Sequence, residues 1–152
     1  MEEEFPSKQL SDRCYLWFFE NGLPGYAWYV PKENGFLNVG IGGKLNSMKK
    51  KGTTLRYYWN LFIEKLVKKG LVDDHRFRPG GYSYYLRQKT GTYQKDRVYL
   101  IGDAAGLASV DMGEGIGPAV KSGLFAADSI ITGHPYNPEC IGKYSLKKIL
   151  IP

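Results

Sequence analysis

The sequence contains few of the residues that form disulfides or hold metals. Its 152 residues include two cysteines, Cys14 and Cys140, and two histidines, His75 and His134. The cysteines lie near opposite ends, and neither histidine has a second ligand at a metal-binding spacing, so we expect no disulfide framework and no metal site. So few cysteines are typical of the reducing cytoplasm, where we expect the chain.

Long hydrophobic runs are also missing. A membrane-spanning helix needs about 20 consecutive apolar residues, and no segment approaches that length. The first stretch, MEEEFPSKQLSD, is acidic and polar, which excludes a signal peptide. We therefore expect a soluble protein, or one at most peripheral to a membrane.

Motifs of several large functional classes are absent. No serine elbow, catalytic carboxylate pair or phosphate loop is present, so nothing indicates a hydrolase or a transferase. Without an arginine-rich helix or a nucleic-acid motif, we expect no nucleic-acid partner. The net charge of +6 includes lysine clusters at 49–51, 68–69 and 147–148. Such clusters attract phosphates or anionic membranes, although most are simply solvated surface.

What the sequence does contain begins with the pattern of an antiparallel meander. Aromatic and β-branched residues predict strands at 14–20, 26–31 and 36–43. The first two are separated by the turn NGLPG, and the second pair by Asn34-Gly35, a dipeptide that strongly favours a tight hairpin. A three-stranded sheet of this kind needs another element of structure that packs on one of its faces.

The next segment predicts that cover, a helix. Thr53 can cap its start, and Gly70 lies where a left-handed glycine ends a helix. Seven apolar residues of this helix at helical spacing predict the face that packs on the sheet: Leu55, Tyr58, Trp59, Phe62, Ile63, Leu66 and Val67.

Residues 78–88, which follow the helix, are expected to form a loop followed by another strand.

The pattern changes after residue 95. The apolar run at 98–101 predicts a strand buried on both faces. A glycine-rich loop and a helix to about Thr132 follow, and another helix is expected from Ile141. One side of the first helix carries Ile116, Val120, Leu124, Ala127 and Ile131, and its small residues, which allow a close neighbour, are Gly117, Ala119, Ser122, Gly123 and Ala126.

The loop between this strand and helix carries a candidate binding site. Asp103 follows the strand, where a carboxylate can accept hydrogen bonds from sugar-type hydroxyls. Small residues after it allow a ligand to lie against the backbone, and the helix beginning near Gly115 offers free N–H groups and a positive dipole end. The alternative is a glycine-rich turn in which Asp103 is only a cap.

Two stretches together resemble a known family. GDAAG followed by GEGI and a small-residue helix is similar to the second flavin-binding signature of FAD-dependent oxidoreductases related to p-hydroxybenzoate hydroxylase, and most similar to geranylgeranyl reductases. Those reductases also carry Y-x-W-x-F-P followed by G-x-G. Here Tyr26, Trp28 and Pro31 precede Gly40 and Gly42, with valine in place of the phenylalanine.

The resemblance implies an α/β (α+β) fold, in part a Rossmann-like FAD/NAD(P)-binding flavoprotein fold. Residues 1–95 would belong to the substrate domain, with its antiparallel sheet and covering helix, and 96–152 would form the C-terminal strand, loop and helix of the FAD domain. By this resemblance the substrate side comprises Tyr26, Trp28 and Pro31, and the FAD side comprises Gly102, Asp103, Ala104, Gly106, Gly113, Glu114, Gly115 and Ile116.

The same resemblance implies the reaction. The chain would be the C-terminal part of an FAD-dependent oxidoreductase that reduces double bonds of geranylgeranyl or polyprenyl lipids. The electrons would come from reduced ferredoxin or NAD(P)H, and a peripheral membrane contact would suit such a substrate. No catalytic residue is identified.

Departures from the family pattern leave alternatives open. Val110 and Asp111 stand where the family usually has proline, and Asp111 would be unfavourable beside a flavin that gains negative charge. The first glycine motif, G-x-G-x-x-G, is absent, and Gly113, Gly115 and Gly117 do not match its spacing. The isolated chain is therefore expected to be inactive.

Two other functions stay in view. One is a flavin monooxygenase or halogenase of the same superfamily, although many hydroxylases have histidine where Gly106 stands. The other is a non-catalytic fragment or binding module that needs a separate N-terminal half.

Overall fold

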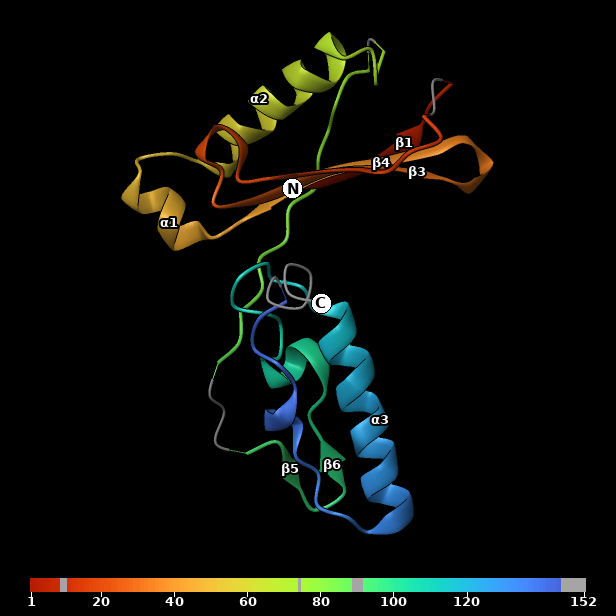
Figure 1. Ribbon diagram of the computed structural model, residues 1–152, viewed down its shortest axis with the longest axis vertical. Coiled ribbons are helices and arrows are strands. Elements are labelled where there is room, and N and C mark those ends of the chain that lie inside the picture. Colours follow the sequence, from red (N-terminus) through yellow and green to blue (C-terminus); the bar gives the residue numbers. More distant parts are fainter. Residues whose placement is uncertain (9–10, 74, 89–91, 146–152) are drawn as a thin grey trace. The chain divides into compact units, whose positions relative to one another are not determined.

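The computed structural model describes residues 1–8, 11–73, 75–88 and 92–145 (Figure 1). The chain forms two compact units, Met1–Tyr82 and Ser83–Pro152. Its architecture is mixed α/β with an antiparallel sheet, which confirms the coarse fold class. The functional division expected between residues 95 and 96 stays a prediction.

The described residues contain no helix that combines the length and the apolar character needed to cross a bilayer.

The first unit is built on an antiparallel sheet in which the predicted meander is confirmed. Asn34 and Gly35 adopt left-handed backbone angles, with φ of 60° and 76°, so the hairpin turn uses the two residues that tolerate them. The strand order is β1-β4-β3-β2. The strands are β1 (Glu2–Pro6), β2 (Tyr15–Phe18), β3 (Gly25–Lys32) and β4 (Phe36–Gly43).

Strand β1 was not predicted, because its sequence is mostly charged. It pairs with β4 at the edge of the sheet, where charged side chains are common. Phe5 packs into the core at 5% exposure. Glu3 lies on the same face, with its Oε1 2.8 Å from Nε2 of His75. Strand β1 thus joins the sheet through one buried aromatic side chain and through polar contacts with residues distant in the sequence.

The covering helix is confirmed as α2 (Leu55–Lys68), and Figure 1 shows it lying across one face of the sheet. Its cap is Thr54, whose Oγ1 accepts from the backbone N–H of Tyr57 at 3.2 Å. The prediction of Thr53 is wrong by one residue, since the Thr53 hydroxyl donates to the Met48 carbonyl instead. Gly70 has the predicted positive φ, 64°.

The core of this unit lies between α2 and the sheet. Of the predicted helix face, Val67 is exposed and was wrongly included, because it lies on the solvent side of the last turn. Each large apolar side chain buried here contributes about 1.5–3 kcal/mol relative to exposure. The central residues are Tyr29, Leu37, Val39 and Ile41 from the sheet and Trp59, Phe62 and Leu66 from α2.

The strand predicted within residues 78–88 does not form. Instead, Gly80 makes a single antiparallel bridge to Glu2, with backbone hydrogen bonds of 3.0 and 2.9 Å. The alternating aromatics that suggested a strand are on the surface, with Tyr82 and Tyr85 at 85% and 77% exposure. Because these rings stay on the surface and bury no apolar area in a core, the alternating pattern of residues 78–88 did not produce a strand.

The second unit contains a short hairpin, a long helix and irregular segments. The predicted doubly buried strand is wrong: β6 spans Val98–Tyr99, pairs with β5 (Gln94–Lys95), and leaves Val98 64% exposed. Among the described residues β5 is its one strand partner, and Tyr136 packs on Tyr99, but Leu100 and Ile101 stay 38% and 43% exposed. The helix expected from Ile141 is not formed over residues 141–145, and its remainder lies outside the described residues.

Helix α3 (Ile116–Thr132) confirms the predicted helix and uses its small residues for packing. Pro118, Ser122, Ala126 and Ser129 are buried. The larger apolar side is exposed, with Ile116 at 81% and Ile131 at 82%. The helix packs within its unit through the small-residue side and presents its bulky apolar side at the surface.

Candidate functional site

Trp28 and Gly40, which come from the two halves of one sequence motif, pack against each other across neighbouring strands. Trp28 of β3 is the register partner of Gly40 of β4. A Cβ atom on Gly40 would lie 2.1 Å from Cζ2 of the indole. The ring therefore lies flat on the bare backbone of the next strand, and only glycine at position 40 permits this.

A chain of polar contacts holds the indole in that position. Its Nε1 donates to Oδ1 of Asn38 at 2.6 Å. The Asn38 amide in turn donates to Glu4, whose Oε2 lies 2.8 Å from Nζ of Lys32. The hydrogen bond with Lys32 lowers the pKa of Glu4 and that with Glu4 raises the pKa of Lys32. Both charges therefore persist at neutral pH.

The sheet face opposite α2 carries a row of aromatic rings. The Trp28 and Tyr26 centroids are 5.5 Å apart, and those of Tyr26 and Phe18 are 6.0 Å apart. Leu16, the partner of Trp28 on β2, is 54% exposed beside them. We call these four residues the aromatic face: Leu16, Phe18, Tyr26 and Trp28.

The predicted substrate residues are only partly brought together. Tyr26 and Trp28 share the aromatic face, as their spacing predicts. By strand alternation Pro31 falls on the opposite side, where its partner Leu37 is fully buried. Pro31 can shape the end of β3, but its ring does not join Tyr26 and Trp28. Phe18 and Leu16 were not predicted as site residues, because aromatic and aliphatic residues occur in most strands and do not by themselves indicate a binding site.

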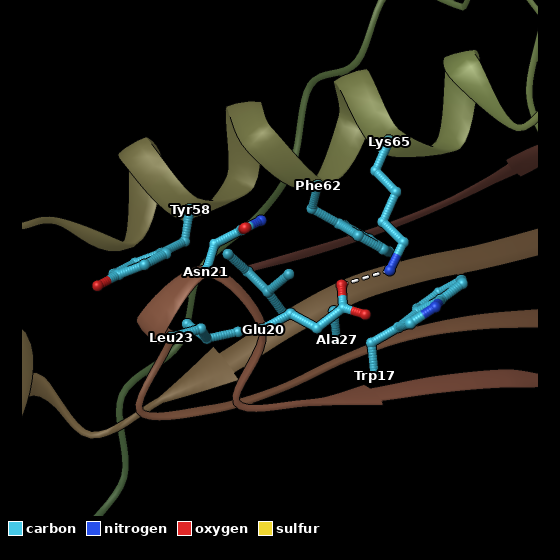
Figure 2. Close-up of a pocket in the computed structure, with 9 residues that line it drawn as sticks. Trp17, Glu20, Asn21, Leu23, Ala27, Tyr58, Phe62 and Lys65 are labelled. Carbon is cyan, nitrogen blue, oxygen red and sulfur yellow. Dashed lines mark hydrogen bonds and ion pairs between the residues drawn. The ribbon is translucent and has the colours of Figure 1, made fainter.

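Among the described residues, the α2 side of the sheet shows no cavity large enough for a lipid chain. Its cavity holds about 20 Å³, roughly the space of one water molecule. Figure 2 shows this cavity, with Lys65 of α2 reaching Glu20 to form an ion pair. The Lys65 ammonium also lies 4.4 Å from the Trp17 ring centroid. The aromatic face is therefore the surface of this sheet on which an apolar chain can lie.

In the second unit, Asp103 lies in the short helix η3 (Gly102–Ala105), directly after the apolar run. Gly102 has a φ of 54°, and its N–H donates to the buried hydroxyl of Ser122 on α3 at 2.9 Å. Within the described residues, no hydrogen bond or ion pair engages the exposed Asp103 carboxylate. Helix α3 thus anchors the backbone before Asp103 and leaves its side chain available to a ligand.

Several predicted cofactor residues lie together around this carboxylate. A Cβ atom on Gly115 would lie 2.8 Å from Oδ1 of Asp103. Gly106 ends η3 with a φ of 61°, and Ala104 is exposed beside Asp103. A partnerless carboxylate facing bare backbone fits a hydroxyl-bearing chain such as the ribityl part of FAD.

The loop that leads to α3 is closed by Ser109, a residue that the sequence did not single out. Ser109 is 1% exposed, and its hydroxyl accepts from the Glu114 N–H at 2.9 Å. Its N–H donates to the Glu114 carbonyl at 2.9 Å. Tyr84 donates its hydroxyl to the Gly113 carbonyl at 2.6 Å. These contacts fix Gly113 and Glu114, and neither Ser109 nor Tyr84 belongs to a motif that could have revealed them.

The start of α3 differs from the prediction in one respect. The Glu114 carboxylate accepts from the N–H of Gly117 at 2.5 Å. That N–H group is therefore not free for a ligand, and the favourable charge at this positive helix end comes from the protein itself. Ile116, the next predicted cofactor residue, is 81% exposed at the first position of the helix.

Asp111, the unexpected acid, has a structural role. Its Oδ1 accepts from the N–H of Met112 at 2.9 Å and from the N–H and the hydroxyl of Ser145, both at 3.1 Å. Three donors satisfy this carboxylate, which ties the loop to the C-terminal segment.

Neither a metal cluster nor a large apolar cavity is found in the described part of the chain. No group of three His, Cys, Asp or Glu residues there could hold a metal ion. A hollow of about 330 Å³ in the second unit is lined mainly by polar and charged residues: Arg87, Gln88, Tyr93, Val110, Glu139 and Lys143. This lining does not suit a prenyl chain.

Comparison with known proteins adds an independent result. The family described as geranylgeranyl reductase catalytic domain matches residues 5–76. A digeranylgeranylglycerophospholipid reductase of Thermoplasma volcanium is 36% identical over 125 residues, covering 79% of this chain and 30% of the relative. A menaquinone reductase of Mycolicibacterium smegmatis is 32% identical, covering 73% of this chain and 27% of the relative.

A plant protein matches a shorter segment. The chloroplastic geranylgeranyl diphosphate reductase of Nicotiana tabacum is 41% identical over 56 residues, covering 37% of this chain and 12% of that protein. The search of solved structures found no match. The chain spans about 30% of the length of the first two curated relatives it matches. The family match and these relatives show that the chain belongs to the geranylgeranyl reductase family.

Proposed function

We propose that this chain supplies the prenyl-binding sheet and the ribityl-facing loop of an FAD-dependent reductase of polyprenyl lipids. The observation that carries the proposal is the aromatic face, in which the indole of Trp28 packs on Gly40 beside Tyr26. A polyprenyl chain is long, apolar and free of charge, so aromatic rings on a surface without side-chain bulk can pack along it. The digeranylgeranylglycerophospholipid and geranylgeranyl diphosphate reductases among the relatives support a prenyl substrate.

The residues around Asp103 would hold the cofactor. The Asp103 carboxylate would accept a hydrogen bond from a ribityl hydroxyl, and Ala104 and Gly115 would leave room for the chain beside it. Gly102, Gly106 and the loop residues Gly113, Glu114 and Ile116 would shape the backbone that holds the cofactor. When bound, FAD supplies the electron transfer, which this polypeptide does not itself provide. Within the protein, Ser122 positions the backbone before Asp103, and Ser109 and Tyr84 fix the loop at Gly113 and Glu114.

The overall reaction is the addition of two electrons and two protons to a carbon–carbon double bond. Reduced ferredoxin or NAD(P)H is the proposed electron source. We propose the cytoplasm as the location, with a peripheral membrane contact through which a lipid substrate is reached.

We further propose that the second unit is part of a Rossmann-like FAD-binding domain and packs against additional polypeptide in the flavin-binding form. The exposed apolar side of α3, with Ile116, Val120, Leu124 and Ile131, supports this proposal. The absence of G-x-G-x-x-G from the sequence supports it as well, because that motif holds the pyrophosphate of FAD. The chain alone should therefore purify colourless and inactive, and a stoichiometric flavin absorption spectrum would contradict this.

The reductase is favoured over a monooxygenase or halogenase of the same superfamily. The relatives named above are reductases. Gly106 also stands where many hydroxylases have histidine, with a left-handed φ of 61° that glycine adopts without strain.

A chimera tests the proposal. In this reductase chimera, the present chain replaces the matching segment of the Thermoplasma volcanium relative. With dithionite as reductant, we expect bound FAD and a product heavier by two hydrogens for each reduced bond of a digeranylgeranyl lipid. A flavin-loaded chimera that leaves this lipid unchanged, while the parent enzyme reduces it, would contradict the proposal.

A further inference from the structure

One end of the sheet in the first unit joins a turn to a short helix. Helix α1 (Leu45–Lys50) follows β4, and its C-cap Lys51 donates from Nζ to the Gly22 carbonyl at 2.9 Å. The Lys44 N–H donates to the Pro24 carbonyl at 3.0 Å. The turn between β2 and β3 and the helix α1 therefore form one continuous surface.

This surface carries positive charge without nearby compensation. No acidic residue occurs between Glu33 and Glu64, whereas Lys44, Lys49, Lys50, Lys51 and Arg56 lie in that stretch. Within the described residues, no ion pair involves Lys44, Lys49 or Lys50. Glu20, the acid of the adjacent turn, is already neutralised by Lys65.

Apolar side chains project from the same surface. Phe19 is 52% exposed and has a φ of 58°, a left-handed conformation that a bulky residue rarely adopts. Leu45 is 56% exposed, and Lys49 is its neighbour one turn along α1, while Met48 anchors the helix in the core at 2% exposure. We call this surface the basic tip, defined by Phe19, Lys44, Leu45, Lys49 and Lys50.

We propose that the basic tip docks on the surface of an anionic phospholipid bilayer. A bilayer offers negative headgroups to the lysines and an apolar boundary to Phe19 and Leu45, and charge and apolar insertion together are what stable surface binding requires. A free anion would leave the exposed phenylalanine and leucine without a partner.

The position of the basic tip relative to the aromatic face supports this occupant. Phe18 ends the aromatic row and is followed directly by Phe19 of the tip. A lipid chain leaving the bilayer at the tip would meet Phe18, then Tyr26 and then Trp28. The inference deepens the proposed function and rests on it for the reason to approach a membrane, but vesicle binding itself needs neither flavin nor turnover.

The test is cosedimentation of the purified chain with vesicles of phosphatidylcholine, with or without phosphatidylglycerol. We expect binding to the anionic vesicles, loss of binding at high salt, and little binding to phosphatidylcholine alone. Lys49→Gln with Lys50→Gln should weaken partitioning about 25-fold, since each surface lysine contributes about fivefold. Phe19→Asn, which suits the left-handed backbone, should weaken it about tenfold with an unchanged circular dichroism spectrum.

The matched control is Lys68→Gln with Lys69→Gln, the same change of charge at the far end of α2. It should leave binding within about twofold of the unchanged chain. Equal losses in the two double variants, or no preference for anionic vesicles, would overturn the inference. Vesicle binding that fails while the reductase chimera is active would overturn the docking surface alone and leave the proposed function standing.

Discussion

The indole of Trp28 occupies the space that a side chain at position 40 would fill. Gly40 is its cross-strand partner, and an added Cβ atom would lie 2.1 Å from the ring. Gly42, two residues along the same strand, has more room, since its Cβ would lie 3.8 Å from the same indole. The Y-x-W and G-x-G parts of the motif are therefore a single packing unit rather than two separate signals.

This contact predicts unequal effects of two identical substitutions. Gly40→Ala should destabilise the first unit by about 1–3 kcal/mol, because the indole must leave its position and its bond to Asn38. Gly42→Ala should lower the stability of this unit by a smaller amount. All three tryptophans, at positions 17, 28 and 59, lie in this unit, so their fluorescence during urea unfolding reports on it alone. Equal midpoints for the two variants would contradict the packing described.

Asp103→Asn should weaken retention of FAD in the reductase chimera by about fivefold, because the amide oxygen still accepts a hydrogen bond but lacks the charge that strengthens it by about 1 kcal/mol. Flavin release measured by dialysis gives the result. Asp128→Asn, an equal change of charge at an exposed position of α3, is the control. If Asp103→Asn retains flavin as well as the control does, the Asp103 carboxylate does not hold the ribityl chain.

Ser122→Ala should act on the same site through the backbone. The Gly102 N–H is buried and would lose its acceptor, so the second unit should become less stable by about 1–3 kcal/mol. The Gly102 amide should then exchange hydrogen faster in deuterated water. Lys121→Ala, at the exposed neighbouring position, should leave this exchange unchanged. Unchanged exchange in Ser122→Ala would show that the hydrogen bond is not formed.

The sequence predicted the parts of the fold in which local and tertiary preferences agree. The Asn34-Gly35 turn, strands β3 and β4, and the apolar stripe of α2 each satisfy a short-range rule and also bury apolar surface. Strand β1 escaped prediction because it contributes a single large side chain, Phe5, to the core. Its remaining contacts depend on β4 and Gly80, which are distant in the sequence.

The failures in the second unit have a different cause. The run at 98–101 has the composition of a buried strand, but among the described residues its one strand partner is the short β5. An apolar pattern predicts that a segment will be buried, but it does not show which other segment packs against it. The same holds for the bulky side of α3. At the site, the spacing of Asp103 and Gly115 was informative, whereas Ser109 and Tyr84 act through backbone contacts that no motif encodes.

The most direct test of the account is Trp28→Ala in the reductase chimera. If the aromatic face binds the prenyl chain, reduction of a digeranylgeranyl lipid should fall at least tenfold, equivalent to about 1.4 kcal/mol. Bound FAD and its reduction by dithionite should stay near those of the unsubstituted chimera, and Trp28→Phe should recover part of the rate. Melting temperatures show whether each variant is folded. A folded, flavin-loaded Trp28→Ala variant that reduces the lipid at the full rate would contradict the account.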